Sequence, residues 1–165
     1  MTRAWFVLAG VLIGASHLVV ASQPKYKAIV KAVQPAALAK ARTYAWTASH
    51  PSFDKAADHL IVAAVDRELA ARGFTKLPTG PGDVVVTYAS LSKTHVDLKS
   101  KVAKGGPYRE FLVGTLVVDL SDPASRQLLF RVQMDMPIDK DPAALETAIN
   151  AVVTAMFDKY PTPKH

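Results

Sequence analysis

The chain has 165 residues, enough for one domain, and half of them are apolar, which excludes an intrinsically disordered protein. It contains no cysteine, which excludes disulfides, cysteine nucleophiles, thiolate metal sites and lipid attachment through a cysteine. The formal net charge is +6, so a partner recognised by charge is expected to be anionic.

The N-terminal segment has the pattern of a cleaved secretory signal. Arg3 precedes an apolar run, and small residues follow at Ala21 and Ser22. We place the cleavage after Ala21, which makes residues 1–21 a signal peptide and residues 22–165 a single periplasmic or secreted domain. The apolar run also reaches the lower length limit of a membrane-spanning helix. The alternative is therefore an inner-membrane anchor formed by an uncleaved N-terminal helix.

Basic residues are concentrated at the start of the predicted domain. Between residues 22 and 50 the chain has no acidic residue and five basic ones, namely Lys25, Lys27, Lys31, Lys40 and Arg42. Nucleic acid is excluded as the partner of an exported protein, whereas anionic lipid or an envelope polymer would attract these charges, at about 1 kcal/mol per lysine near an anionic membrane. Lys25, Lys27 and Lys31 form the candidate interaction edge. The alternative is a solvated strand face.

The first predicted elements are two strands and a helix. Residues 25–33, KYKAIVKAV, alternate in polarity, which predicts an edge strand whose lysines discourage further pairing. An alanine-rich turn follows Pro35, and residues 42–48, RTYAWTA, favour a second short strand. From residue 54 to 72 the apolar residues recur with helical spacing, and Gly73 is a suitable terminator, so we predict an amphipathic helix.

The next predicted elements are two strands and a loop. Residues 83–92, DVVVTYASLS, are rich in β-branched residues, and residues 95–102, HVDLKSKV, alternate in polarity. We predict an antiparallel pair joined by a turn at residues 92–94. Residues 103–109, AKGGPYR, have the composition of a loop.

The last predicted elements are a hairpin and a helix. Residues 111–120 are apolar on both faces, as in a central strand, and residues 128–136 alternate. They are joined by residues 121–125, SDPAS, in which Asp122 suits the first position of a type I turn. Asp141 and Pro142 then begin an amphipathic helix. The predicted fold is α+β, with an antiparallel sheet of about five to six strands and two amphipathic helices on one face.

No catalytic residue is predicted. Asp119 and Asp122 could form an acid pair, but the turn explains Asp122 more simply. Three histidines remain after the signal and the C-terminus are set aside, and no nucleophile motif accompanies them: His50, His59 and His95. The rival hypothesis, a small periplasmic hydrolase or ligand-binding enzyme, requires a pocket that contains His95, Asp97 or Asp119 with a perturbed pKa.

No metal or cofactor site is predicted either. No two histidines have helical ligand spacing, and the acids Asp135, Asp139 and Asp141 stand where a strand ends and a helix begins. The glycine pairs at 80–82 and 105–106 lack a following helix that would bind phosphate. Three aromatic residues could line a pocket for sugar or lipid, although core or boundary packing is the preferred interpretation of the first two: Tyr44, Trp46 and Tyr108.

Five segments in a fixed order resemble a known family. They are RTYAW, VDRELAARGF, DVVVTY, GTLVVDLSDPASRQLLFR and INAVVTAMFDKYP. Together they resemble the bacterial domain-of-unknown-function 4136 family from about residue 26 to residue 161. The resemblance implies an α+β envelope protein, often a lipoprotein, with no assigned activity. Ser22 stands where a lipoprotein has its acylated cysteine, and Phe130 where relatives often have tryptophan.

We therefore expect an exported, cell-envelope-associated, non-enzymatic protein. Its partner would be a protein, an anionic lipid or an envelope polymer, bound through the basic N-terminal edge and the loop at 103–109. A third class of function is that of a structural or assembly subunit, which would differ from the binding protein only in its stoichiometry.

Overall fold

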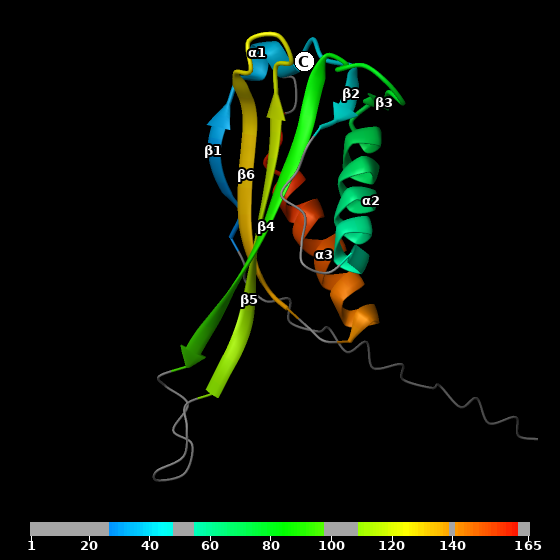
Figure 1. Ribbon diagram of the computed structural model, residues 1–165. Helices are drawn as coiled ribbons and strands as arrows, with labels where there is room; N and C mark the ends of the chain where they lie inside the picture. The colour runs from blue at the N-terminus through cyan, green and yellow to red at the C-terminus, as the bar shows by residue number, and fades with distance from the viewer. Residues whose placement is uncertain (1–26, 48–54, 98–108, 139–140, 162–165) are drawn as a thin grey trace, which may run out of the picture.

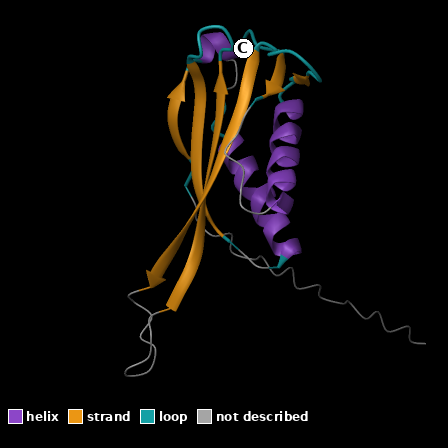
Figure 2. Cartoon of the chain, viewed as in Figure 1, coloured by secondary structure: helices purple, strands orange, loops and turns teal. Residues whose placement is uncertain are grey.

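The computed structural model describes residues 27–47, 55–97, 109–138 and 141–161. Within these residues a six-stranded sheet carries two long helices, α2 (Lys55–Ala71) and α3 (Pro142–Phe157), on one of its faces (Figures 1 and 2). The predicted signal peptide at residues 1–21, its cleavage site at Ala21 and Ser22, and Lys25 lie outside the described residues.

The sheet has the strand order β1-β6-β5-β4-β2-β3. The strands are β1 (Ile29–Val33), β2 (Thr43–Trp46), β3 (Thr75–Lys76), β4 (Val84–Asp97), β5 (Arg109–Ser121) and β6 (Leu128–Pro137). The predicted α+β class and the predicted number of strands are confirmed. β1 lies at one edge, as its lysines predicted.

The prediction of a purely antiparallel sheet is wrong. β2 pairs in parallel with both β3 and β4, whereas the β1–β6, β5–β6 and β4–β5 pairs are antiparallel. The reason is the helix α2 (Lys55–Ala71), which connects β2 to β3 and supplies the crossover that a parallel pair requires.

The two long helices begin and end close to their predicted limits. After α2, Gly73 has φ 83, the left-handed conformation that terminates helices at low cost for glycine. Asp141 caps α3 (Pro142–Phe157), since its carboxylate accepts a hydrogen bond from the amide of Ala143. The predicted alanine-rich turn after β1 is in fact a short helix, α1 (Pro35–Leu38).

The predicted turn at residues 92–94 is also wrong. β4 continues through these residues, and Ser92 lies opposite Gly114 and Thr94 opposite Leu112 in an unbroken ladder with β5. The segment has no glycine or proline to impose a turn, and its polar side chains are exposed in a strand that leaves the body of the molecule. β4 therefore pairs with β5, and residues 95–97, predicted as part of a separate strand at 95–102, belong to β4 itself.

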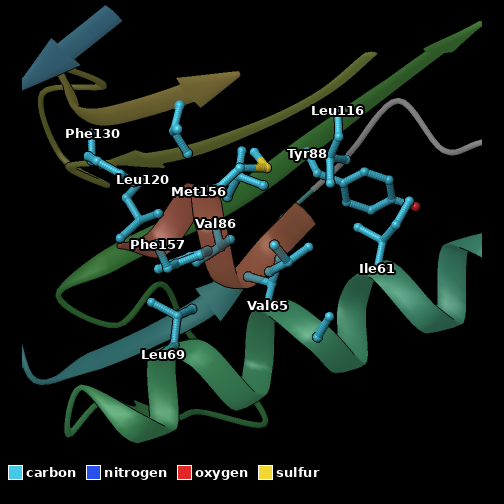
Figure 3. Close-up of a cluster of buried hydrophobic side chains, with 14 of the residues drawn as sticks. Ile61, Val65, Leu69, Val86, Tyr88, Leu116, Leu120, Phe130, Met156 and Phe157 are labelled. Atoms are coloured by element: carbon cyan, nitrogen blue, oxygen red, sulfur yellow. The ribbon is translucent and has the colours of Figure 1, made fainter. Parts of the chain in front are cut away.

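The core lies between the sheet and the helix pair. In Figure 3, Ile61, Val65 and Leu69 of α2 point toward side chains of β4 and β5, while Met156 and Phe157 approach from α3. Each such fully buried side chain contributes about 1.5–3 kcal/mol relative to an exposed one. Aromatic rings fill the end near the C-terminus, where the Phe130 and Tyr160 rings lie 5.4 Å apart.

Among the described helices, none combines the length and the apolar character needed to span a membrane.

Candidate functional site

The sheet face opposite α2 and α3, called the open face below, is covered by no described helix (Figure 1). It contains a hollow of about 600 Å³ over β1, β4, β5 and β6. The hollow is lined by Lys31, Thr87, Tyr88, Ala89, Val117, Asp119, Arg131 and Gln133. Because its lining has two cations, one carboxylate and several polar groups, the hollow suits an anionic or polar partner better than an apolar one.

An ion pair forms the floor of this hollow. Arg131 donates from Nε to Asp119 Oδ1 at 2.7 Å and from Nη2 to Asp119 Oδ2, so the guanidinium binds the carboxylate with two bonds. The two residues lie opposite each other in the β5–β6 ladder. Asp119 raises the pKa of Arg131, chiefly through this hydrogen bonding. The formal charges of the two side chains cancel within this pair.

Lys31 is the predicted edge residue that the structure places at the hollow. β1 pairs antiparallel with β6, and the register shifts between Val30 and Ala32, which sets Lys31 in an irregular position beside Arg131. Lys27 is exposed just before β1. Of the predicted basic edge, the structure thus describes Lys27 and Lys31, with Lys31 next to the Asp119–Arg131 pair.

Asp122 belongs to the turn and not to an acid pair. Its Oδ1 accepts hydrogen bonds from the amide of Ser125 at 2.6 Å, the hydroxyl of Ser125 at 2.8 Å and the amide of Ala124 at 3.0 Å. These donors, the amide of Ser125 first, lower the pKa of Asp122. Since Asp119 is bound to Arg131, the two carboxylates have separate structural partners.

The residues named for a hydrolase are not brought together. Asp119 lies opposite Thr87 on the body of the sheet, whereas exposed His95 is eight positions further along β4. At about 3.3 Å per residue this is a separation of roughly 26 Å along the strand. The side chain of Asp97 lies outside the described set, as does His50, and His59 is exposed on α2.

The aromatic pair of β2 serves packing. The Tyr44 hydroxyl and the Trp46 indole both donate to Asp66 Oδ1 on α2, at 2.7 and 2.8 Å. Burial, followed by the hydrogen bond to Asp66, raises the pKa of Tyr44. Trp46 also lines a shallow hollow of about 640 Å³, but Tyr44 does not. The packing interpretation of Tyr44 is confirmed, and Tyr108 lies outside the described residues.

A second, apolar hollow of about 390 Å³ opens between the sheet and the N-terminal ends of α2 and α3. Unlike the first hollow, it is lined by no titratable side chain. Its lining residues are Ala56, Ala57, Leu60, Ile61, Ser90, Gly114, Thr115, Leu116, Met136, Ile138, Pro142, Leu145 and Ile149. It therefore offers no acid or base for catalysis.

No group of three or more metal-ligating side chains occurs among the described residues. Asp135 accepts a hydrogen bond from the Thr115 hydroxyl at 2.7 Å, and Asp141 caps α3. Asp139 lies outside the described residues.

Sequence reasoning missed a buried carboxylate that ties α2 to α3. Glu68 accepts hydrogen bonds from the Thr154 hydroxyl at 2.6 Å and from Arg72 Nη1 at 2.8 Å, while Arg72 Nη2 donates to the Phe157 carbonyl at 2.7 Å. Burial raises the pKa of Glu68, but these donors outweigh it and the net shift is downward. The i,i+4 spacing of Glu68 and Arg72 was the available signal for their pairing.

Sequence reasoning also missed Asp83, which joins the starts of β2 and β4. Its Oδ2 accepts from the amides of Arg42 and Thr43 at 2.8 and 2.9 Å, and these bonds lower the pKa of Asp83. The contact is structural, and the forty-residue separation left no local signal for it.

Comparison with known proteins identifies the family and the fold. The pattern of the family described as "Domain of unknown function (DUF4136)" matches residues 29–162. A comparison with curated proteins gave no match.

Among solved structures, the PelC dodecamer from Paraburkholderia phytofirmans is similar at a TM-score of 0.51 and 10% identity, over 83% of this chain and 99% of that one. A PDZ domain protein from Parabacteroides distasonis gives a TM-score of 0.49 at 11% identity, over 84% of this chain and 36% of that one. The similarity to PelC, at 10% identity, concerns the fold alone.

Proposed function

From the premise that the chain belongs to the DUF4136 family, we propose that it is an exported, cell-envelope-associated and non-enzymatic protein that binds an anionic envelope component through its open face. The component would be the head groups of an anionic lipid or a charged envelope polymer. The predicted signal peptide at residues 1–21 supports export, and the envelope location is what the family resemblance implies.

The observation that carries the proposal is the uncompensated positive charge at β1. Asp119 neutralises Arg131, whereas no ion pair within the described part of the chain involves Lys27 or Lys31. Lys31 is exposed at the rim of a hollow, where an anionic group would meet its ammonium and the edge of the Arg131 guanidinium together. Such an arrangement attracts anions without a dedicated catalytic group.

The absence of catalysis is part of the proposal. Support comes from the distance between His95 and Asp119 along β4 and from the apolar hollow, whose lining holds no titratable side chain. A hydrolase that uses a side-chain nucleophile needs a base within hydrogen-bond reach of it.

The test is retention in the cell envelope. The double variant Lys27→Glu/Lys31→Glu should be lost from the washed envelope fraction and appear in the soluble periplasmic fraction, with an unchanged melting temperature. At about 1 kcal/mol per lysine, removal of the attraction alone weakens membrane binding roughly thirtyfold, and reversal weakens it further.

The matched control is Lys40→Glu/Lys159→Glu, which changes the net charge equally at exposed positions away from the hollow. This control should be retained like the wild type. Equal retention of the two double variants would refute binding through the open face. Binding of the purified chain to vesicles with and without anionic lipid then separates a lipid from a polymer partner.

A further inference from the structure

The exposed large aliphatic side chains of the described residues gather on two parts of the sheet. Ile29, Val30 and Val33 belong to β1 and are 37–43% exposed, while Leu91, Val96 and Leu112 belong to β4 and β5 and are 41–53% exposed. A soluble domain seldom exposes aliphatic groups in clusters unless another surface covers them. Both clusters therefore mark contact surfaces.

The second cluster lies on the far part of the β4–β5 pair, residues 91–97 of β4 and 109–115 of β5, called the ribbon below. β6 accompanies β5 only as far as Val113, which lies opposite Pro137, so residues 94–97 and 109–112 of the ribbon have no third strand beside β5. Figure 1 shows the ribbon continuing past β6 and away from α2 and α3. Two strands without a third strand or a covering helix are marginally stable in water. Docking against another surface would stabilise the ribbon.

The first cluster lies on an edge strand. β1 pairs with β6 on one side and has no strand neighbour on the other side among the described residues. An edge of this kind presents backbone N–H and C=O groups that a further strand could pair with. The edge and the ribbon are thus two different surfaces that each accept a strand.

The apolar side chains of the two surfaces match face for face. In β1, Ile29 lies on the open face, opposite Gln133, while Val30 and Val33 lie on the helix-bearing face, opposite Val132 and Phe130. The ribbon has the same distribution, because Leu91 is on the open face and Val96 and Leu112 are on the other. If β1 adds to the ribbon as a neighbouring strand, aliphatic groups meet on both faces.

Charge disfavours a symmetric contact between two β1 edges. Two β1 edges placed together would oppose lysine to lysine through Lys27 and Lys31. The ribbon has two basic and two acidic residues, Lys93, Arg109, Asp97 and Glu110, so its formal charge is zero with histidine neutral. A β1 edge therefore meets no net repulsion at the ribbon of a second copy.

We propose that the protein self-associates head to tail, with β1 of one copy adding as a strand to the β4–β5 ribbon of the next. Because the two surfaces differ, each copy keeps one of each surface free after the first contact. Association continues until a ring closes or a filament forms. This inference does not depend on the anionic partner proposed above.

Mixing of complementary variants tests the arrangement. The ribbon variant Leu91→Lys/Val96→Lys and the β1 variant Ile29→Lys/Val33→Lys should each be monomeric by light scattering coupled to gel filtration. Mixed together, they retain one intact pair of surfaces and should form a heterodimer that grows no further. The wild-type chain 22–165 should give species larger than a dimer.

The control Ala63→Lys/Ala70→Lys adds the same charge at exposed positions of α2 and should associate like the wild type. The ribbon variant changes no core side chain, so a melting temperature equal to that of the wild type verifies its fold even if the β1 variant is destabilised. A monomeric wild type, or a ribbon variant that associates as before, would overturn the proposal. A symmetric dimer of either variant on its own would overturn the head-to-tail arrangement.

Discussion

Tyr44 is buried and Tyr160 is partly buried, and their hydroxyl groups differ in hydrogen bonding. The Tyr44 hydroxyl donates to Asp66 at 2.7 Å. The Tyr160 hydroxyl is buried without a hydrogen-bond partner among the described residues, although its ring packs edge-on against Phe74 and Phe130. Burial raises the pKa of Tyr160 to about 12. The ring of Tyr160 therefore stabilises the fold, whereas its hydroxyl opposes it.

Substitution of the two tyrosines by phenylalanine should have opposite effects. Tyr160→Phe should raise the free energy of unfolding by about 1 kcal/mol, since it removes an unsatisfied buried hydroxyl, and Tyr44→Phe should lower it by about 1–2 kcal/mol.

The raised pKa of Tyr160 in the folded state makes stability depend on alkaline pH. Above about pH 10 the unfolded chain loses this proton before the folded one does, so the free energy of unfolding declines as the pH rises toward 12. Tyr160→Phe should accordingly lose less stability over that interval. Urea titrations at pH 7 and across the alkaline range measure both effects, and an unchanged alkaline slope would contradict the account of Tyr160.

At the scale of the elements, the sequence pattern predicted those features that depend on residues close together in the chain. Asp122 was placed correctly in its turn because a carboxylate before proline binds amides two and three residues ahead. The extent of β4 and the direction of β2 were not predictable in this way. β4 passes through residues 92–94 because β5 pairs with it, and β2 runs parallel to β4 because α2 intervenes. Both depend on partners distant in the chain.

The junction between β2 and β4 depends on Gly82. Gly80 and Gly82 both have positive φ, but only at Gly82 would an added Cβ contact the backbone of Tyr44, at 2.9 Å from its Cα. Gly80→Ala should therefore cost only the left-handed conformation, about 1–2 kcal/mol. Gly82→Ala should cost about 2 kcal/mol more, since β2 must move. The difference between the two variants in the free energy of chemical unfolding measures the cost of the contact between the added Cβ and the Tyr44 backbone. Equal losses of stability in the two variants would show that this contact is unimportant.

At the scale of the whole molecule, the candidate site combines predicted and unpredicted residues. Lys31 was singled out from the basic run, but its neighbour Arg131 follows it by a hundred positions and reaches it only through the β1–β6 ladder. The Asp119–Arg131 pair likewise depends on the register of β5 and β6. A single sequence indicates which residues are charged, whereas the sheet determines which charges are compensated.

The location of the protein is the claim on which its proposed role depends, and intact mass after cell fractionation tests it most directly. The account predicts a chain that begins at Ser22, without residues 1–21, in the periplasmic or envelope fraction. A chain that retains residues 1–21 and remains in the cytoplasmic fraction would contradict it.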